Sequence, residues 1–275
     1  VEFTLSTRNI STKNFKWTTD FIFSNAKNKV TELKSDANVM SMISGSGFAL
    51  EGNPVRSLYS LNFQGLNKEG LPTFINEKGE LTVTDINFQE RENKSHLVYE
   101  GSTDPTITGS FGNIFSYKGF KLNVFMTYSF GNVIRLDPVF HNAYSDLDAT
   151  PREFKNRWTV AGDEKITTVP VIADLRQNTM NSYLNKAYNA YNYSTERIAK
   201  GDFIRMKEIS VTYEFPKTMV SKLSLSNLSL KIQGTNLFLL YADKKLNGQD
   251  PEFFNSGGVA VPVPKQFTLT LRLGI

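Results

Sequence analysis

The sequence predicts an all-β protein, and within that class a transmembrane antiparallel β-barrel. Apolar and polar residues alternate with a period of two in segments of about ten residues, which is the length that a tilted strand needs to cross a bilayer. Aromatic residues make up 12% of the chain, although its mean hydropathy is only -0.31. Short turns also alternate with long loops, as they do in membrane-spanning barrels.

The composition excludes several other classes. The chain has 275 residues and a net charge of +4, and its basic residues are scattered among acidic ones. This distribution forms no basic patch for nucleic acid or anionic lipid. Cysteine is absent, which excludes disulfides, thiolate metal sites and a cysteine nucleophile. The longest unbroken apolar run, 237–242, is far shorter than the roughly 18 residues of a membrane helix.

The strongest strand prediction lies at the end of the sequence, from Lys265 to Ile275. One face of this segment carries only apolar residues, namely Phe267, Leu269, Leu271, Leu273 and Ile275. An apolar ladder that continues to the last residue indicates a paired edge whose apolar face is covered. A closed membrane barrel provides both conditions.

Further strands follow from the same alternation. It is strong in 14–24, 120–130, 208–215 and 228–238, and weaker in 1–9, 57–65 and 106–117. Together these segments predict about eight strands. In a barrel, the apolar positions contact lipid. The predicted lipid-facing residues are Leu122, Val124, Met126, Tyr128, Phe130, Ile209, Val211, Tyr213, Phe215, Leu228, Leu230 and Ile232.

The connections predict the orientation of the strands. Gly119 marks a tight hairpin between Tyr117 and Phe120, because such turns need a positive φ. Residues 136–201 show no sustained period, and an unstructured stretch of that length is usually functional. Counting back from a periplasmic C-terminus places 66–104, 136–201 and 240–264 outside the cell, and 26–55 and 216–226 on the periplasmic side.

A water-soluble β-sandwich or β-propeller remains the alternative at this point. Sandwiches show turn signals about every 8 to 12 residues, which this sequence does not. The strands are also long, and aromatic residues cluster near their ends, as the interfacial girdles of membrane barrels do. The pattern therefore favours the membrane barrel.

Several motifs resemble the C-terminal part of the SusC/RagA family of TonB-dependent outer-membrane transporters. They occur in the order expected for that family and are spread over most of the chain. The similar segments are 99–105, 109–122, 127–131, 156–164, 194–196, 201–216 and 234–238.

This resemblance implies a fold and a transport function. A member of the family is a bacterial outer-membrane barrel of about 22 strands with a folded plug in its lumen. It imports oligosaccharides or peptides captured by a SusD-like surface lipoprotein, and the TonB complex supplies the energy. Residues 1–275 would then form the last staves of the barrel, with 136–201 as a long extracellular loop. The plug domain and the TonB box would lie outside this sequence, and 267–275 would resemble the C-terminal signal for barrel assembly.

Candidate substrate contacts lie in the long loop. Trp and Tyr side chains offer flat faces for sugar rings or peptides, and the candidates are Trp158, Tyr183, Tyr188, Tyr191, Asn192 and Tyr193. Alternatively, these residues pack the loop on itself or against the lipoprotein. Asp163 and Glu164 could bind hydroxyls or Ca²⁺, but a structural salt bridge is the simpler interpretation because the spacing of a calcium loop is missing.

No catalytic residue, metal site or cofactor is predicted. His96 and His141 lie far apart without a metal-ligand motif, and no nucleophile elbow or phosphate-binding glycine loop occurs. The protein is therefore not expected to be an enzyme. Two non-transport alternatives remain, namely a soluble glycan-binding β-domain and a structural outer-membrane barrel that does not transport.

Overall fold

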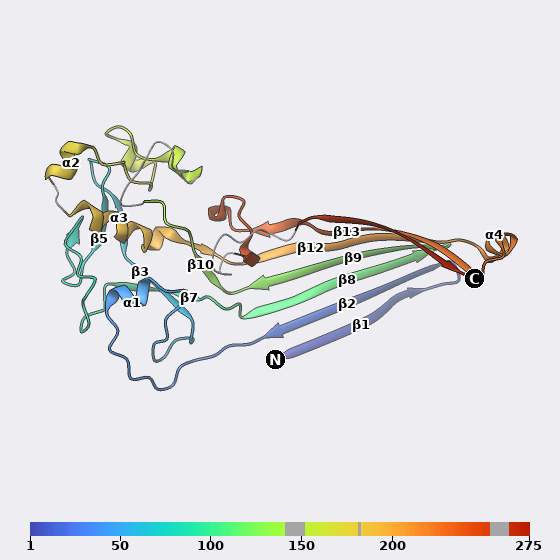
Figure 1. The fold of residues 1–275 in the computed structure, drawn as a ribbon. Helices are drawn as coiled ribbons and strands as arrows, with labels where there is room; N and C mark the ends of the chain where they lie inside the picture. The colour runs from blue at the N-terminus through green and yellow to red at the C-terminus, as the bar shows by residue number, and fades with distance from the viewer. Residues whose placement is uncertain (141–151, 181–182, 254–263) are drawn as a thin grey trace.

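The computed structural model describes residues 1–140, 152–180, 183–253 and 264–275. The described chain has two parts, a long twisted sheet and a region of loops and short elements at one end of it (Figure 1). The sheet has seven strands in the order β1-β2-β8-β9-β12-β13-β14, and every neighbouring pair is antiparallel. Its strands are β1 Glu2–Ser11, β2 Phe15–Asn25, β8 Ile107–Tyr117, β9 Phe120–Phe130, β12 Phe203–Glu214, β13 Asn227–Ala242 and β14 Gln266–Gly274.

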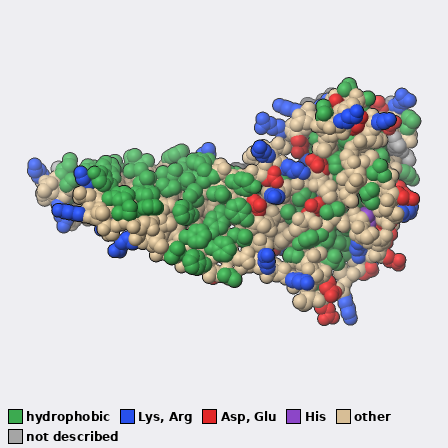
Figure 2. All heavy atoms as spheres, turned by 180° about the vertical axis from the view of Figure 1, so that it is seen from behind, with side chains coloured by type: hydrophobic (Ala, Val, Ile, Leu, Met, Phe, Trp, Pro, Cys, Tyr) green, Lys and Arg blue, Asp and Glu red, His purple; other side chains and the backbone are tan. Residues whose placement is uncertain are grey.

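One face of the sheet is apolar across all seven strands. Directly paired residues of antiparallel strands point to the same side, and Val124 pairs with Ile209 while Leu230 pairs with Leu271. Figure 2 shows this face as a broad apolar surface. Its side chains are strongly exposed, for example Ile232 at 58% and Leu269 at 68%. We call this surface the outer face of the sheet.

A small polar group interrupts the outer face and is bonded internally. The Trp17 indole N–H and the Thr19 hydroxyl both donate to Asn113 Oδ1, at 2.9 and 2.7 Å. The Asn9 side-chain amide donates to Thr19 Oγ1 at 2.6 Å. These bonds reduce the cost of placing polar side chains on an apolar surface.

The opposite face of the sheet is polar, and we call it the inner face. A hollow of about 320 Å³ lies over β9, β12, β13 and β14, lined by charged and hydroxyl side chains. On this face Glu208 Oε1 accepts a hydrogen bond from Asn123 at 3.0 Å, and Lys231 Nζ lies 3.5 Å from the same oxygen. The alternation predicted from the sequence therefore separates an apolar face from a polar one.

The connections at one end of the sheet are short. The β8–β9 hairpin turns through Lys118 and Gly119, with φ of 44° and 86°, as predicted. β12 and β13 are joined by α4 (Lys217–Val220) and the 3-10 turn Ser221–Leu223. The C-terminus also lies at this end, whereas the N-terminus lies toward the other end (Figure 1).

The opposite end carries three long connections, 26–106, 131–202 and 243–265, and here two predictions are wrong. Segment 57–65 does contain a strand, β3 (Ser57–Leu61), but this strand pairs with β7 (Leu97–Ser102) in a separate two-stranded sheet and is not part of the large sheet. All five residues of β3 are buried. The predicted ends of the connections were assigned by counting strands back from the C-terminus. With one crossing strand fewer, 26–55 lies at the long-loop end of the sheet and not at the short-turn end, so this second prediction is also wrong.

Segment 136–201 also contains more structure than its sequence suggests, although 141–151 and 181–182 lie outside the described residues. Short strands and helices occur throughout the loop region. They are too short to give a long periodic pattern in the sequence. They are α1 Val39–Ile43, β4 Phe63–Leu66, β5 Pro72–Ile75, β6 Leu81–Thr82, β10 Val133–Arg135, η1 Arg152–Asn156, η2 Asp163–Lys165, α2 Leu175–Met180, α3 Leu184–Asn192, η3 Thr195–Arg197, β11 Ile198–Lys200, η5 Lys244–Leu246 and η6 Pro251–Phe253.

The loop region has its own hydrophobic core. We call the packed part of 26–106 and 131–202 the loop body, because both segments contribute to one cluster of buried side chains. The short helix α1 enters this cluster, and a reciprocal capping box between Asn38 and Ser41 fixes its start. The cluster consists of Val39, Met42, Ile43, Tyr59, Leu61, Phe74, Ile86, Val139, Phe140, Phe154, Ala190 and Tyr191.

None of the described helices is long and apolar enough to cross a membrane.

Candidate functional site

The helix α3 positions three of the six predicted substrate contacts; it buries two of them in the loop body and packs the third, Tyr188, against the same core. The Tyr188 ring stacks on Phe140 with centroids 4.6 Å apart. Its hydroxyl donates to the Val171 carbonyl and accepts from the Ala173 N–H, both at 2.9 Å. Tyr188 therefore fastens the segment before α2 to α3.

Tyr191 and Asn192 lie deeper in the same core. Tyr191 is 1% exposed and makes edge contacts with Phe63 and Phe140 at 5.6 Å, and burial raises the pKa of its hydroxyl. Asn192 Oδ1 accepts from the Val139 and Phe140 N–H groups at 3.0 and 3.2 Å. The Asn192 amide donates to the Phe140 carbonyl at 2.7 Å. These side chains hold 139–140 against α3.

Trp158 packs on the chain as well. Its ring covers Gly70, where an added Cβ would collide with the indole. The indole N–H donates to Glu164 Oε2 at 3.2 Å, and the Trp158 N–H donates to the Val169 carbonyl at 2.9 Å. The glycine at position 70 is the one sequence signal that could have indicated this contact, and its φ is 76°.

Asp163 and Glu164 stabilise their own loop. Asp163 Oδ2 accepts from the Thr159 and Val160 N–H groups at 2.9 and 3.1 Å, and these backbone bonds lower the pKa of Asp163. Glu164 Oε2 accepts from the Gly162 N–H at 2.8 Å. Within the described residues neither carboxylate forms the expected salt bridge, because backbone donors occupy both.

The remaining two candidates are more accessible. Tyr183, at the start of α3, is 61% exposed, and Lys186 Nζ lies 5.1 Å from the centre of its ring. Tyr193 is half-buried, with the Arg135 guanidinium 5.5 Å from its ring centre. The structure thus does not gather the six predicted residues into one site, and among them Tyr183 presents the most open ring.

The exposed tip of 157–183 also carries apolar side chains that the sequence pattern did not single out. They are not part of a periodic stretch, so only the structure identifies them. Their exposed fractions are 62% for Val160, 84% for Ile166, 43% for Ile172 and 71% for Met180. Together with Tyr183 they are the exposed large apolar side chains in the described part of the long loop, and we call these five residues the tip surface.

A second feature missed from the sequence is a partly buried arginine with an acidic side chain near it in the loop body. Arg135 Nη2 donates to the Tyr59 carbonyl at 2.6 Å, and burial lowers the pKa of Arg135 to about 10. Burial also raises the pKa of nearby Glu100. Arg135 and Glu100 come from β10 and β7, which are distant in sequence, so no local pattern joins them.

The described residues include no group of three or more His, Asp or Glu side chains that could hold a metal ion. His96 is 5% exposed, and burial lowers the pKa of its ring. His141 lies outside the described residues.

The chain matches no protein-family model. Among curated proteins, it is 26% identical over 267 residues to TonB-dependent receptor P3 of Formosa agariphila, covering 91% of this chain and 24% of that protein. TonB-dependent receptor P39 of the same organism is 24% identical, with coverage of 100% and 30%. The chain therefore spans about a quarter of the length of these curated relatives.

Solved structures agree on the fold. The structure of the RagAB peptide transporter superposes with a TM-score of 0.70 at 20% identity, covering 100% of this chain and 29% of that chain. The RagAB peptide importer in its "closed-closed" state gives a TM-score of 0.69. The relatives are named as receptors and transporters, which agrees with the prediction that the chain is not an enzyme. The predicted resemblance is thereby confirmed: this chain is similar over nearly its whole length to one part of TonB-dependent receptors, and it shares the fold of the corresponding part of RagAB.

Proposed function

We propose that the chain is the C-terminal part of a SusC-like, TonB-dependent transporter of the bacterial outer membrane. The outer face of the sheet carries this proposal. Ile232, Leu269 and their neighbours expose large apolar side chains over all seven strands, while the inner face is lined with charges and hydroxyls. Such a sheet suits lipid on one side and an aqueous lumen on the other.

The proposal extends to the whole barrel. Residues 1–275 form seven strands of a barrel of about 22 strands, and the remaining strands close the barrel between β14 and β1. The two edges of the sheet then disappear, as hydrogen bonding in lipid requires. The twelve predicted lipid-facing residues contact acyl chains, and Phe267, Leu269, Leu271, Leu273 and Ile275 serve as the assembly signal. The plug and the TonB box belong to the rest of the protein.

The short turns are periplasmic in this proposal, and the loop body faces the cell exterior. The polarity of known outer-membrane barrels supports this orientation. The imported substrate is an oligosaccharide or a peptide, delivered by a SusD-like lipoprotein. Of the predicted contacts, Tyr183 is the one we assign to the substrate or the lipoprotein, together with the tip surface. Trp158, Tyr188, Tyr191, Asn192 and Tyr193 act indirectly, by shaping the loop that presents it.

The test uses a strain that lacks the full-length gene. Growth is measured on a panel of oligosaccharides and peptides, and the tagged protein is purified in detergent to identify a bound lipoprotein. We expect loss of growth on at least one substrate and a stoichiometric lipoprotein partner. Unchanged growth on every substrate, together with purification of the protein alone, would remove the proposal. Extraction without detergent would instead favour a soluble glycan-binding domain.

A further inference from the structure

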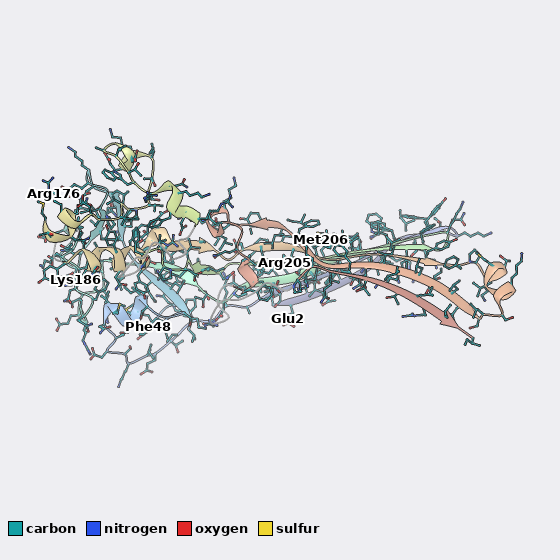
Figure 3. The ribbon with its side chains drawn as sticks, turned by 45° about the horizontal axis from the view of Figure 1, so that its top comes forward. Glu2, Phe48, Arg176, Lys186, Arg205 and Met206 are labelled. Atoms are coloured by element: carbon teal, nitrogen blue, oxygen red, sulfur yellow. The ribbon has the colours of Figure 1, made fainter. Side chains whose placement is uncertain are left out.

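The third long connection crosses the junction between the sheet and the loop body. We call its described part, residues 243–253, the strap. It follows β13, contains η5 and η6, and touches β10, β11, β12 and the segment around η1. Arg205 on β12, labelled in Figure 3, lies at this junction.

Arg205 is the main attachment of the strap to the sheet. Its side chain is 6% exposed and forms ion pairs with two strap residues, Asp250 through Nη2 and Glu252 through Nε, the latter at 2.9 Å. Lys207 Nζ lies 3.7 Å from the other Glu252 oxygen. Removing one partner of such a buried pair leaves an uncompensated charge, which is strongly unfavourable. The Arg205–Asp250 pair is therefore shielded from water, whereas Glu252 and Lys207 are each 35% exposed and add a partly solvated pair to the same attachment.

The first half of the strap is attached to β10 and β11. Leu246 is 1% exposed and packs with Ile134, Leu136 and Ala199. Asp243 Oδ2 accepts from the Lys200 N–H at 2.8 Å, and its other oxygen accepts from the Lys245 N–H at 2.9 Å. One aspartate thus starts η5 and connects it to β11.

Glu153 and Glu196 connect the strap to the loop body. Glu153 Oε1 pairs with Arg197 Nη1 at 2.5 Å, while its Oε2 accepts from the Asn247 amide at 3.3 Å. Glu196 Oε1 lies 3.6 Å from Lys245 Nζ. Arg197 is 4% exposed and also donates to the Asp137 carbonyl at 2.6 Å. The strap therefore contacts both the loop body and a strand of the sheet.

We propose that the strap is an ionic clasp that fixes the tilt of the loop body on the sheet. The loop body packs on its own core, so its position on the sheet depends on the connecting backbone and on this clasp. Most clasp contacts are polar, and within the described part of the strap the buried apolar residues are Leu246 and Pro251, so release exposes only a limited apolar surface. Opening the clasp frees the loop body to move as one unit.

The first experiment measures hydrogen–deuterium exchange in the full-length protein in detergent. Arg205→Met removes the charge and keeps most of the side-chain length. Strap amides, including those of 245–249, are expected to exchange at least about tenfold faster, because their local opening becomes easier. Lys244→Met is the matched control, since Lys244 is exposed and forms no ion pair within the described residues. Its exchange should equal that of the wild type.

A second variant keeps the result interpretable if Arg205→Met does not fold. Asp250→Asn combined with Glu252→Gln removes the same ion pairs from the strap side and leaves β12 unchanged. Faster strap exchange in either folded variant supports the clasp. Wild-type exchange in both variants overturns it.

Spin labels test the tilt itself. The chain contains no cysteine, so Lys68→Cys on the loop body and Lys222→Cys at the short-turn end can be labelled in a full-length protein freed of other cysteines. The distance distribution between them should broaden in the Asp250→Asn, Glu252→Gln variant and stay narrow in Lys244→Met. Equal distributions in all three proteins would show that the strap does not control the tilt.

Discussion

The sheet and the loop body use the same apolar residue types in opposite ways. On the sheet, Leu269 and Phe267 are 68% and 77% exposed, whereas in the loop body Phe74 and Leu61 are fully buried. Among the described residues, the loop body has the sequestered core of a protein folded in water, and the outer face of the sheet does not. The sheet depends on a surrounding that is itself apolar, and the two parts therefore need different solvents.

The largest effect that tests this contrast is expected in the core of the loop body. Phe74→Ala should destabilise the loop body by about 3–5 kcal/mol, because it removes a buried ring and leaves a cavity. Local stability can be measured from hydrogen exchange of α1 and α3. Leu81→Ala is the control, since Leu81 is 65% exposed and should lie within about 0.5 kcal/mol of the wild type. Equal effects of both variants would refute the assigned core.

The outer face gives the next largest effect. Ile232→Arg should cost about 2–4 kcal/mol in lipid vesicles if the side chain lies near the bilayer midplane. Its neighbour Gln233 points to the inner face, so Gln233→Arg should cost far less. Folding titrations in urea with vesicles of defined lipid measure both. A larger cost for Gln233→Arg would reverse the assignment of the two faces.

Tyr128 offers a finer test of the outer face. Its hydroxyl donates to the Ile22 carbonyl at 2.8 Å, and its ring crosses Gly109, where a Cβ would clash with that hydroxyl. Tyr128→Phe should therefore cost about 1 kcal/mol, measured by the same titration. Tyr213→Phe is the control, because no hydrogen bond of the Tyr213 hydroxyl is present within the described residues. A null effect of Tyr128→Phe would mean that lipid or water replaces the bond.

The smallest effect on stability is expected at the tip surface. Tyr183→Ala removes an exposed ring and should change the free energy of unfolding by less than about 0.5 kcal/mol. It should still weaken binding of the substrate or the lipoprotein by about 1 kcal/mol, or roughly fivefold. Binding of the purified lipoprotein by calorimetry and substrate uptake measure this loss. Lys155→Ala, on the same loop, should leave both unchanged, and wild-type values for Tyr183→Ala would exclude a contact role.

Interpretation of the sequence succeeded for the sheet and failed for much of the loop body. Alternation identified β9 at its observed bounds, Phe120–Phe130, and β14 nearly so, because a strand between lipid and water records both solvents in adjacent residues. Alternation misled at Ser57–Leu61, where both faces of β3 are buried. In such a strand, an alternation of apolar and polar residues reflects the protein elements packed on its two faces and not a boundary between lipid and water.

The candidate site was harder to predict because long-range contacts decide it. Tyr191 meets Phe63, and the polar groups of Asn192 pair with the backbone at 139 and 140. An aromatic residue in a loop looks the same in sequence whether it faces a ligand or a core. Arg205 and Asp250 likewise join segments that no local motif connects.

The shared core of the loop body also bears on which segments of such a chain can be exchanged together. Its two segments leave and re-enter the sheet through β2, β8, β9 and β12, which are four consecutive strands of the sheet. A recombination event or an engineered graft that moves 26–106 and 131–202 together carries a complete hydrophobic core to a new barrel. Moving either segment alone splits that core, so the pair is the exchangeable cassette, and the strap contacts are the interface that a recipient barrel must supply.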